Sequence, residues 1–234
     1  MSPTSSTRGP LVSVMIPTFD EESELPGALG HLAALPGHWE ILIADGGSHD
    51  QTLRIARNRG VRVVAEGESR PEQINAAARQ ARGELLLFLH ADSRLPRGAY
   101  AALTAAADDP GVVGGNFALR FTGNDRFSFV LTLTYALHRF FRRYYGDSSL
   151  WVRREAFDRL GGFRPLPFMD DYDFVRRLEA SGRTVCLPGP ALTSPRRWHA
   201  LGVPRTLMSW VVLRLMFRLG VRRPRLARLC SRAR

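Results

Sequence analysis

Three acidic groups stand where apolar runs of strand length end, and acids in such places can hold a cation or move a proton. Asp20 and Glu21 follow one run, Asp45 closes a second, and Asp92 follows a third. Mg²⁺ and Mn²⁺ prefer hard oxygen ligands such as carboxylates, but one Asp cannot hold such an ion alone. Phosphate oxygens would have to supply the other ligands. A nucleotide diphosphate would fit at such a place, together with a Mg²⁺ or Mn²⁺ ion.

A fourth acidic group, made of Asp170, Asp171 and Asp173, opens a predicted helix over residues 170–181. Carboxylates in a first turn favour the positive end of the helix dipole, so their position alone can explain them. A carboxylate can also take the proton from an attacking hydroxyl. The residues by themselves leave both interpretations open.

The residues between these acids follow the periods of strands and helices in turn. Their β-α-β order predicts an α/β fold with a mostly parallel, twisted sheet flanked by helices. Strands are expected at 11–16, 40–44, 61–65, 84–89, 112–119 and 184–187, and helices at 24–35, 51–59, 71–82, 127–145 and 170–181. Right-handed crossovers place the carboxyl ends of parallel strands on one edge, where ligands bind. The acids are therefore expected to converge on one cleft.

Local signals support two helix ends and exclude one class of cofactor. Asp50 is placed to cap the helix over 51–59, and Gly60 is placed to end it. A dinucleotide site needs a glycine-rich turn after the first strand, so that a pyrophosphate can sit on the helix N-terminus. Residues 18–22 read TFDEE and hold no glycine. NAD and FAD are excluded.

The charge of the chain is concentrated in its last part. All 33 basic residues are arginine, and the net charge is +11. Residues 1–192 hold 22 Arg and 22 acids, whereas residues 193–234 hold 11 Arg and no acid. A nucleic-acid-binding module is not favoured, because the body is neutral and carries no recognition motif. Two cysteines without metal-ligand spacing, and an N-terminus without an apolar signal core, predict a cytoplasmic protein.

The basic tail has the composition of a helix that lies on a membrane. Apolar residues from Leu207 to Leu219 are interrupted by Arg214, Arg218 and Arg222, which are four residues apart and share one helical face. Such a helix is typical of an anionic membrane interface. It could also pack on its own domain with solvated arginines. No apolar run is long enough to span a bilayer, so we expect peripheral attachment to the inner face of the cell membrane.

Five segments in this order resemble glycosyltransferase family 2, whose members have the GT-A fold. They are LVSVMIPTFDEE (11–22), EILIADGGSHDQT (40–52), NAAARQARGELLLFLHAD (75–92), GDSSLWVRREAFDRLGGF (146–163) and MDDYDFVRRL (169–178). The chain is most similar to a bacterial subgroup with a His-Ala-Asp metal motif and a late Arg-Arg-Trp. Names in that subgroup range from carotenoid-acid to arsenosugar glycosyltransferases.

The resemblance implies roles for matching positions. Asp171, with Asp170 beside it, would be the general base, and Asp92 would bind the metal. Nucleotide-sugar contacts are implied for Pro17, Thr18, Phe19, Glu21, Asp45, Arg70, Asn75 and Ala91, with Asp45 on a uracil-like base. Asp147, Arg196, Arg197 and Trp198 match positions on the acceptor and diphosphate side.

Three positions depart from the family pattern. His90 stands where the metal motif has its first Asp, so Asp92 is the only expected carboxylate ligand in that motif. Gly46 stands where many relatives have a second acid. Asp170 replaces the commoner Glu of a Glu-Asp pair, and Asp173 is a rival carboxylate for the role of base.

The sequence thus predicts a disordered N-terminus (1–10), a GT-A domain (11–200) and a basic amphipathic tail (201–234) that forms a C-terminal helix. The expected function is inverting, metal-dependent transfer of a sugar from a nucleotide sugar, with UDP favoured. The acceptor would be a small or lipid-like hydroxyl or carboxylate compound, such as a carotenoid carboxylate. An inactive GT-A membrane scaffold and a nucleotidyltransferase are the alternatives, although the acidic loop at 18–22 speaks against the second.

Overall fold

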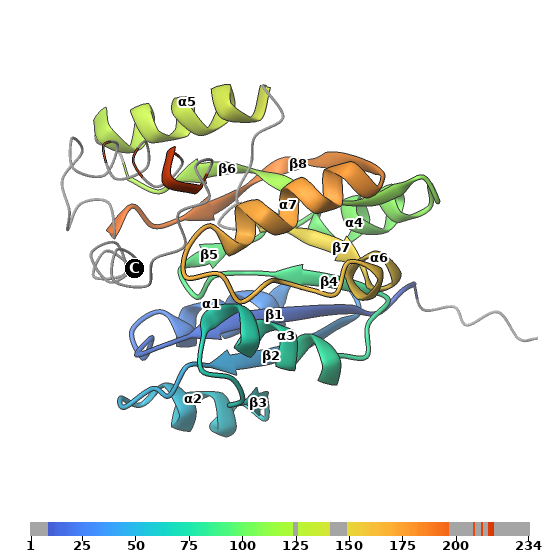
Figure 1. The fold of residues 1–234 in the computed structure, drawn as a ribbon. Helices are drawn as coiled ribbons and strands as arrows, with labels where there is room; N and C mark the ends of the chain where they lie inside the picture. Colours follow the sequence, from blue (N-terminus) through green and yellow to red (C-terminus); the bar gives the residue numbers. More distant parts are fainter. Residues whose placement is uncertain are drawn as a thin grey trace, which may run out of the picture.

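The computed structural model describes residues 9–123, 126–140 and 149–196, together with 208, 212 and 215–217. Within these residues one eight-stranded sheet runs through the protein, with helices on both sides (Figure 1). The strands lie in the order β3-β2-β1-β4-β7-β6-β8-β5. The predicted α/β class with a helix-flanked sheet is therefore confirmed.

The first half of the chain alternates strands and helices as predicted. Its elements are β1 (Val12–Thr18), α1 (Leu25–Ala34), β2 (Trp39–Asp45), α2 (Thr52–Asn58), β3 (Arg62–Val64), α3 (Arg70–Gln80) and β4 (Leu85–Phe88). The pairs β3–β2, β2–β1 and β1–β4 are all parallel. Because Thr18 pairs with Asp45 at the carboxyl end of β1 and β2, the loops that follow these strands emerge side by side.

The second half is less regular. Its elements are β5 (Ser93–Arg94), α4 (Ala99–Ala107), β6 (Val112–Phe121), α5 (Arg126–Phe140), β7 (Trp151–Arg153), α6 (Arg154–Arg159), α7 (Asp170–Ser181) and β8 (Arg183–Thr193). β7 runs antiparallel to both β4 and β6, so the parallel order predicted for the sheet is interrupted at its centre. β6 and β8 are parallel again, and β5 is antiparallel to β8.

β8 is longer than the strand predicted at 184–187. The sequence continues as Pro188-Gly189-Pro190, which breaks the strand pattern. In the structure the pairing with β6 jumps from Leu187 to Pro190, and Gly189 has a φ of 78°. A bulge thus absorbs two residues, and the strand resumes as far as Thr193.

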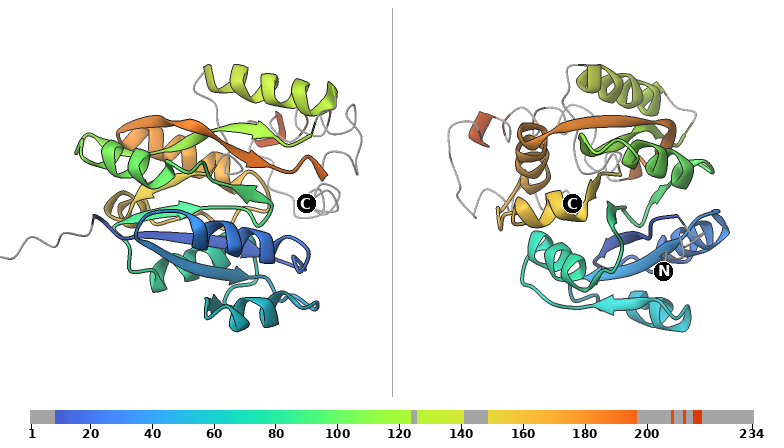
Figure 2. Two further views of the ribbon diagram at one scale, coloured as in Figure 1. Left: turned by 180° about the vertical axis from the view of Figure 1, so that it is seen from behind. Right: turned by 90° about the vertical axis from the view of Figure 1, so that its right-hand side faces the viewer.

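Two apolar cores lie on the two faces of the sheet. Val14 and Ile16 of β1 belong to the core under α1, α2 and α4, and Met15 belongs to the core under α3, α6 and α7. All three side chains are fully buried. This explains why β1 has an unbroken apolar run, as expected of a strand covered on both faces. Figure 2 shows α5 outside these layers, beyond β6.

Two glycines give a direct test of this packing. A Cβ at Gly115 in β6 would lie 1.8 Å from the carbonyl oxygen of Val185 in β8, whereas a Cβ at the exposed Gly30 in α1 meets nothing within 4 Å. We expect Gly115→Ala to lower the free energy of unfolding by on the order of 3 kcal/mol. Gly30→Ala should raise it by up to about 1 kcal/mol, because Ala favours the helix. Urea unfolding measures both, and a wild-type midpoint for Gly115→Ala would contradict the close approach of β6 and β8.

No helix among the described residues is long and apolar enough to cross a bilayer. The predicted C-terminal helix lies mostly outside those residues, although 208, 212 and 215–217 are helical. The predicted helix at 127–145 corresponds to α5 up to Phe140, and residues 141–145 lie beyond the described part.

Candidate active site

The loop after β2 is organised by Asp45, whose side chain is buried. Its Oδ1 accepts hydrogen bonds from the hydroxyls of Thr18 (2.9 Å) and Ser48 (2.6 Å). Its Oδ2 accepts from the backbone amides of Gly47 (2.8 Å) and Ser48 (2.9 Å). Four donors therefore already surround this carboxylate, and Asp45 stabilises the turn over 45–48. The predicted contact of Asp45 with a base stays a prediction, and it would require one of these donors to move.

The loops after β1 and β2 hold each other through reciprocal hydrogen bonds. Asp20 Oδ1 accepts from the amide of His49 (2.7 Å), and Glu22 Oε2 accepts from that of Gln51 (2.9 Å). Asp50 accepts from the amides of Glu22 (2.9 Å) and Thr52 (2.8 Å). The N-cap of α2 is Gln51 and not Asp50 as predicted, although Asp50 does bond the amide of the first helical residue, Thr52. Desolvation alone would raise the pKa of Asp50, but its hydrogen bonds outweigh this and hold the pKa below the usual value.

An aromatic ring projects from this paired loop. The side chain of Phe19 is 58% exposed, and its ring meets that of His49 edge to face with centroids 6.0 Å apart. Pro17, at the end of β1, lines the hollow described below. An exposed ring above a rigid loop is free to stack on a planar ligand.

Arg196, which follows β8, gathers three carboxylates from distant parts of the chain. Its Nε lies 3.3 Å from Asp92 Oδ2, and one terminal nitrogen lies 2.5 Å from Glu21 Oε2. The other lies 3.8 Å from Glu24 Oε1. Partial burial would lower the pKa of this guanidinium, but the hydrogen bond with Glu21 and the three negative charges hold it above its usual value. Three predicted site residues, Glu21, Asp92 and Arg196, are thus brought together.

The neighbourhood of Asp92 fits a cation that is shared with a ligand. The described residues contain no group of three or more His, Cys, Asp or Glu side chains able to hold a metal by themselves. The Asp92 side chain is 6% exposed, and Arg196 places a positive charge on it. A cation could therefore bind Asp92 only in place of Arg196, and most of its coordination sphere would have to come from other oxygens, such as those of a diphosphate. Ala91 beside it is buried, and its carbonyl accepts from Arg94 (2.9 Å).

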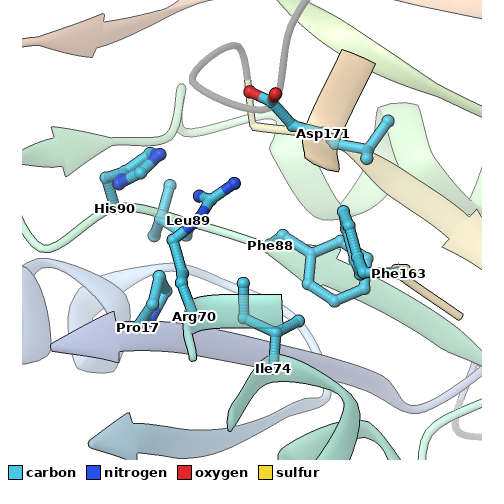
Figure 3. A pocket seen from close by; sticks show the side chains of 9 residues that line it. Pro17, Arg70, Ile74, Phe88, Leu89, His90, Phe163 and Asp171 are labelled. Atoms are coloured by element: carbon cyan, nitrogen blue, oxygen red, sulfur yellow. The ribbon is translucent and has the colours of Figure 1, made fainter. Parts of the chain in front are cut away.

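A shallow hollow that opens to solvent lies beside this cluster (Figure 3). Its lining is mostly apolar and includes three charged or titratable side chains, those of Arg70, His90 and Asp171. The other lining residues are Pro17, Ile74, Phe88, Leu89, Leu150 and Phe163. Because His90 and Asp92 are two residues apart, and Pro17 adjoins the loop over 18–24, the hollow and the Arg196 cluster share both loops.

The three acids at the start of α7 have different surroundings. Asp170 is 1% exposed and accepts a hydrogen bond of 2.7 Å from Arg70. Asp173 pairs with Arg177 (2.8 Å) and Arg164 (3.3 Å). Asp171 is the one that lines the hollow, and Figure 3 shows it across from Ile74. Among the three, Asp171 is therefore the acid placed to meet a ligand.

Asn75 has a positioning role. Its Nδ2 donates to the carbonyl of Phe163 (2.7 Å), and its Oδ1 accepts from the amide of the same residue (2.9 Å). The Phe163 ring in turn stacks on Phe174 with centroids 4.5 Å apart. Asn75 therefore fixes one wall of the hollow. Its predicted contact with the nucleotide sugar stays a prediction, because both ends of its amide are already bonded.

Unusual backbone conformations flank the site. Among the described residues, the non-glycine residues with positive φ are Asp20 (52°), Ser149 (53°) and Met169 (58°). Asp20 lies in the loop after β1, Ser149 precedes Leu150 of the hollow, and Met169 precedes Asp170. Such conformations cost on the order of 1–3 kcal/mol each and cluster at functional sites. Their positions agree with the site built above.

Some predicted residues cannot be placed, and some lining residues were not predicted. Asp147, Arg197 and Trp198 lie outside the described residues. His90, which stands where the metal motif has its first Asp, lines the hollow. The apolar lining, such as Leu150 and Phe163, gave no signal in the sequence because buried apolar residues occur throughout a core.

Residues 13–173 match the family described as glycosyl transferase family 2, and this segment is well over half of the chain. The chain belongs to glycosyltransferase family 2. As a class of enzyme it is therefore a glycosyltransferase.

Relatives of this glycosyltransferase agree with that assignment. It is 28% identical over 237 residues to a "PGL/p-HBAD biosynthesis glycosyltransferase" of Mycobacterium bovis, covering 91% of this chain and 88% of the relative.

Solved structures with the same fold include a mannosyltransferase of Pyrobaculum calidifontis in complex with GDP-Man and Mn²⁺. The TM-score is 0.61 at 22% identity, over 80% of this chain and 57% of that one. S. aureus TarS in complex with UDP-GlcNAc gives a TM-score of 0.62 at 20% identity, over 78% and 58%. The chain thus spans a little over half the length of these two structures, and their fold, GT-A, is also its own.

Proposed function

We propose that this glycosyltransferase moves a sugar from a UDP-sugar, or another nucleotide sugar, to a small or lipid-like acceptor, with inversion at the anomeric carbon. The proposal rests on two neighbouring features at one edge of the sheet: the acidic cluster around Arg196 and the hollow lined by Asp171. Arg196 holds Glu21 and Asp92 together, and Asp171 faces the adjoining hollow. The first feature suits a diphosphate with its cation, and the second suits an acceptor.

The donor would lie over the paired loops after β1 and β2. Phe19 offers an exposed ring for the base, and Asp45 with Thr18 keeps the loop in place. Arg70 and Arg196 carry the positive charges beside the hollow and the acidic cluster. They would oppose the negative charge that grows on the departing diphosphate, which is where electrostatic stabilisation lowers the barrier most.

The metal would be Mg²⁺ or Mn²⁺, held by Asp92 and by the diphosphate of the donor. When bound there, such an ion supplies neutralisation of the leaving group. The solved Pyrobaculum enzyme of the same fold is described with GDP-Man and Mn²⁺, which supports this assignment. Arg196 would release Asp92 as the donor binds, while it keeps its contact with Glu21.

Asp171 would act as the general base. A carboxylate at the hollow can accept the proton of a hydroxyl as that hydroxyl attacks the anomeric carbon from the face opposite the diphosphate. A single displacement of this kind inverts the anomeric centre. Asp170 would have a different role, because its buried carboxylate accepts a hydrogen bond of 2.7 Å from the Arg70 guanidinium and holds that side chain in place. We therefore propose Asp171 as the catalytic residue and Asp170 as a positioning residue.

The acceptor class rests on the apolar lining of the hollow. Six of its nine lining residues are apolar: Pro17, Ile74, Phe88, Leu89, Leu150 and Phe163. A carotenoid carboxylate or another apolar compound, as expected from the His-Ala-Asp subgroup, could pack against this apolar lining. We propose residues 11–200 as the catalytic domain and 201–234 as a tail that holds the enzyme on an anionic membrane surface.

A panel of nucleotide sugars tests the proposal without knowledge of the acceptor. With Mn²⁺ present, we expect slow hydrolysis of one donor, with a UDP-sugar first, to its nucleoside diphosphate. Release of the diphosphate can be followed by chromatography. The full chain should show no hydrolysis in the presence of a chelator. If every donor stays intact with either Mg²⁺ or Mn²⁺, while the protein is folded, the chain would be the inactive scaffold that the His90 departure allows.

A further inference from the structure

Exposed apolar side chains are concentrated at one end of the molecule. Eight large apolar residues are exposed among those that the structure describes, and seven of them belong to α5 or to the tail. On α5 they are Phe129, Val130, Leu133 and Leu137, which form the α5 outer face; in the tail they are Met208, Val212 and Leu215. The eighth is Phe19 at the donor loop. Single exposed apolar residues are normal on a surface, but a group of this kind indicates a contact.

α5 carries apolar residues on its exposed side as well as on its buried side, whereas a helix that faces water normally has a polar outer side. Its inner side packs through Leu131 and Tyr135, which are 3% and 7% exposed, and the Tyr135 ring meets Phe121 at 5.2 Å. The four residues of the α5 outer face span roughly 100° of the helix surface at 3.6 residues per turn. Phe129 is 70% exposed. Packing of α5 on its own domain is already explained by its inner side. The apolar residues of the α5 outer face therefore need another explanation.

The described tail residues show the same arrangement. Phe217 packs on Tyr172 of α7, edge to face with centroids 5.6 Å apart. Met208, Val212 and Leu215 are exposed. Among the described tail residues, Phe217 therefore contacts the domain while these three do not pack on it.

Both features lie in the half of the molecule away from α2 and β3, and the right-hand view of Figure 2 shows the described tail segment and α5 apart, on either side of α7. The surrounding sequence is basic. Residues 193–234 contain eleven arginines and no acid, and residues 120–143 contain five arginines and one acid. Apolar side chains flanked by arginines match the chemistry of an anionic lipid surface.

We propose that the α5 outer face and the exposed tail residues together form a docking surface for an anionic lipid bilayer. The inner side of α5 packs with Met169 and Tyr172, the residues that flank Asp170 and Asp171. Docking would therefore bring the bilayer within about one helix diameter, 10–12 Å, of α7. The docking itself does not depend on the proposed sugar transfer, whereas its consequence, a membrane-borne acceptor, rests on it.

Vesicle flotation of the full chain tests the docking surface. We expect binding to vesicles of equimolar phosphatidylcholine and phosphatidylglycerol, and much weaker binding to pure phosphatidylcholine. Leu133→Asn/Leu137→Asn should reduce the partition coefficient about tenfold or more, because two apolar side chains leave the lipid contact. The matched control is Ala101→Asn/Ala105→Asn on the exposed side of α4. It introduces the same two Asn residues in a helix without removing a large apolar side chain, and it should bind as the wild type does.

Several outcomes would overturn the docking surface. Unchanged binding of Leu133→Asn/Leu137→Asn contradicts the role of α5, and equal binding to neutral vesicles contradicts the role of charge. A wild-type dimer that this variant converts to monomers, with vesicle binding intact, would show that a second copy covers the face. Circular dichroism confirms that each variant is folded. Hydrolysis of the soluble donor is measured in parallel, so that its absence counts against the sugar transfer and not against docking.

Discussion

Asp171→Asn is expected to lower donor hydrolysis about 10²- to 10⁴-fold, because a positioned general base contributes that much to a rate. In this assay water takes the place of the acceptor, and an amide cannot remove its proton. The change keeps the size of the side chain, and Asp171 is not the acid that holds Arg70, which pairs with the buried Asp170 at 2.7 Å. Donor affinity should therefore remain within a few-fold of wild type, as measured by calorimetry with the nucleoside diphosphate.

The matched control is Asp173→Asn, two residues further along the same helix. Asp173 is held by Arg177 (2.8 Å) and Arg164 (3.3 Å), and Arg177 also binds the carbonyls of Leu160 and Gly162 (both 2.8 Å). This variant should lose some stability and little turnover. If Asp173→Asn loses turnover while Asp171→Asn keeps it, the two roles are exchanged and the assignment of the base is wrong.

Asp171→Asn also reports on the acceptor. A hydroxyl must lose a proton when it attacks, but a carboxylate is already ionised and needs no base. With a carboxylate acceptor, Asp171→Asn would therefore slow hydrolysis by water and spare transfer to that acceptor. With a hydroxyl acceptor, both rates would fall together.

The fold was largely predictable because its first half follows simple periods. The strands at 11–16, 40–44 and 84–89 were recognisable as apolar runs, since β1 and β4 are covered on both faces. α7 begins and ends where its pattern predicts, at Asp170 and Ser181. β7 was missed because three residues cannot display a period. α4 was missed because its sequence, AYAALTAAA, is alanine-rich and offers little contrast between its sides.

The site was predictable in its location but not in its internal bonding. The carboxyl edge of the sheet brings the loops of β1, β2 and β4 together, so Glu21 and Asp92 were expected to converge. Their shared partner Arg196 lies 175 and 104 residues away in sequence, and a single sequence holds no signal for such a contact. Asp45 had a local signal, since Asp-Gly-Gly-Ser is typical of a turn in which the Asp side chain bonds the following amides.

Asp92→Asn is expected to reduce Mn²⁺-stimulated hydrolysis by at least about a hundredfold, since it removes the one predicted protein carboxylate on the metal and weakens stabilisation of the leaving group. The fold should persist, because the amide oxygen can still accept from Arg196, which now lies 3.3 Å from Asp92. Turnover and Mn²⁺-dependent binding of UDP should fall together, the second measured by calorimetry without any acceptor. Asp109→Asn is the matched control, as it removes the charge of an exposed Asp that pairs with Arg183 at the amino end of β6 and β8. Turnover and Mn²⁺ dependence that both match wild type in Asp92→Asn would show that the cation, if one is used, binds elsewhere, and that Asp92 serves only to hold Arg196.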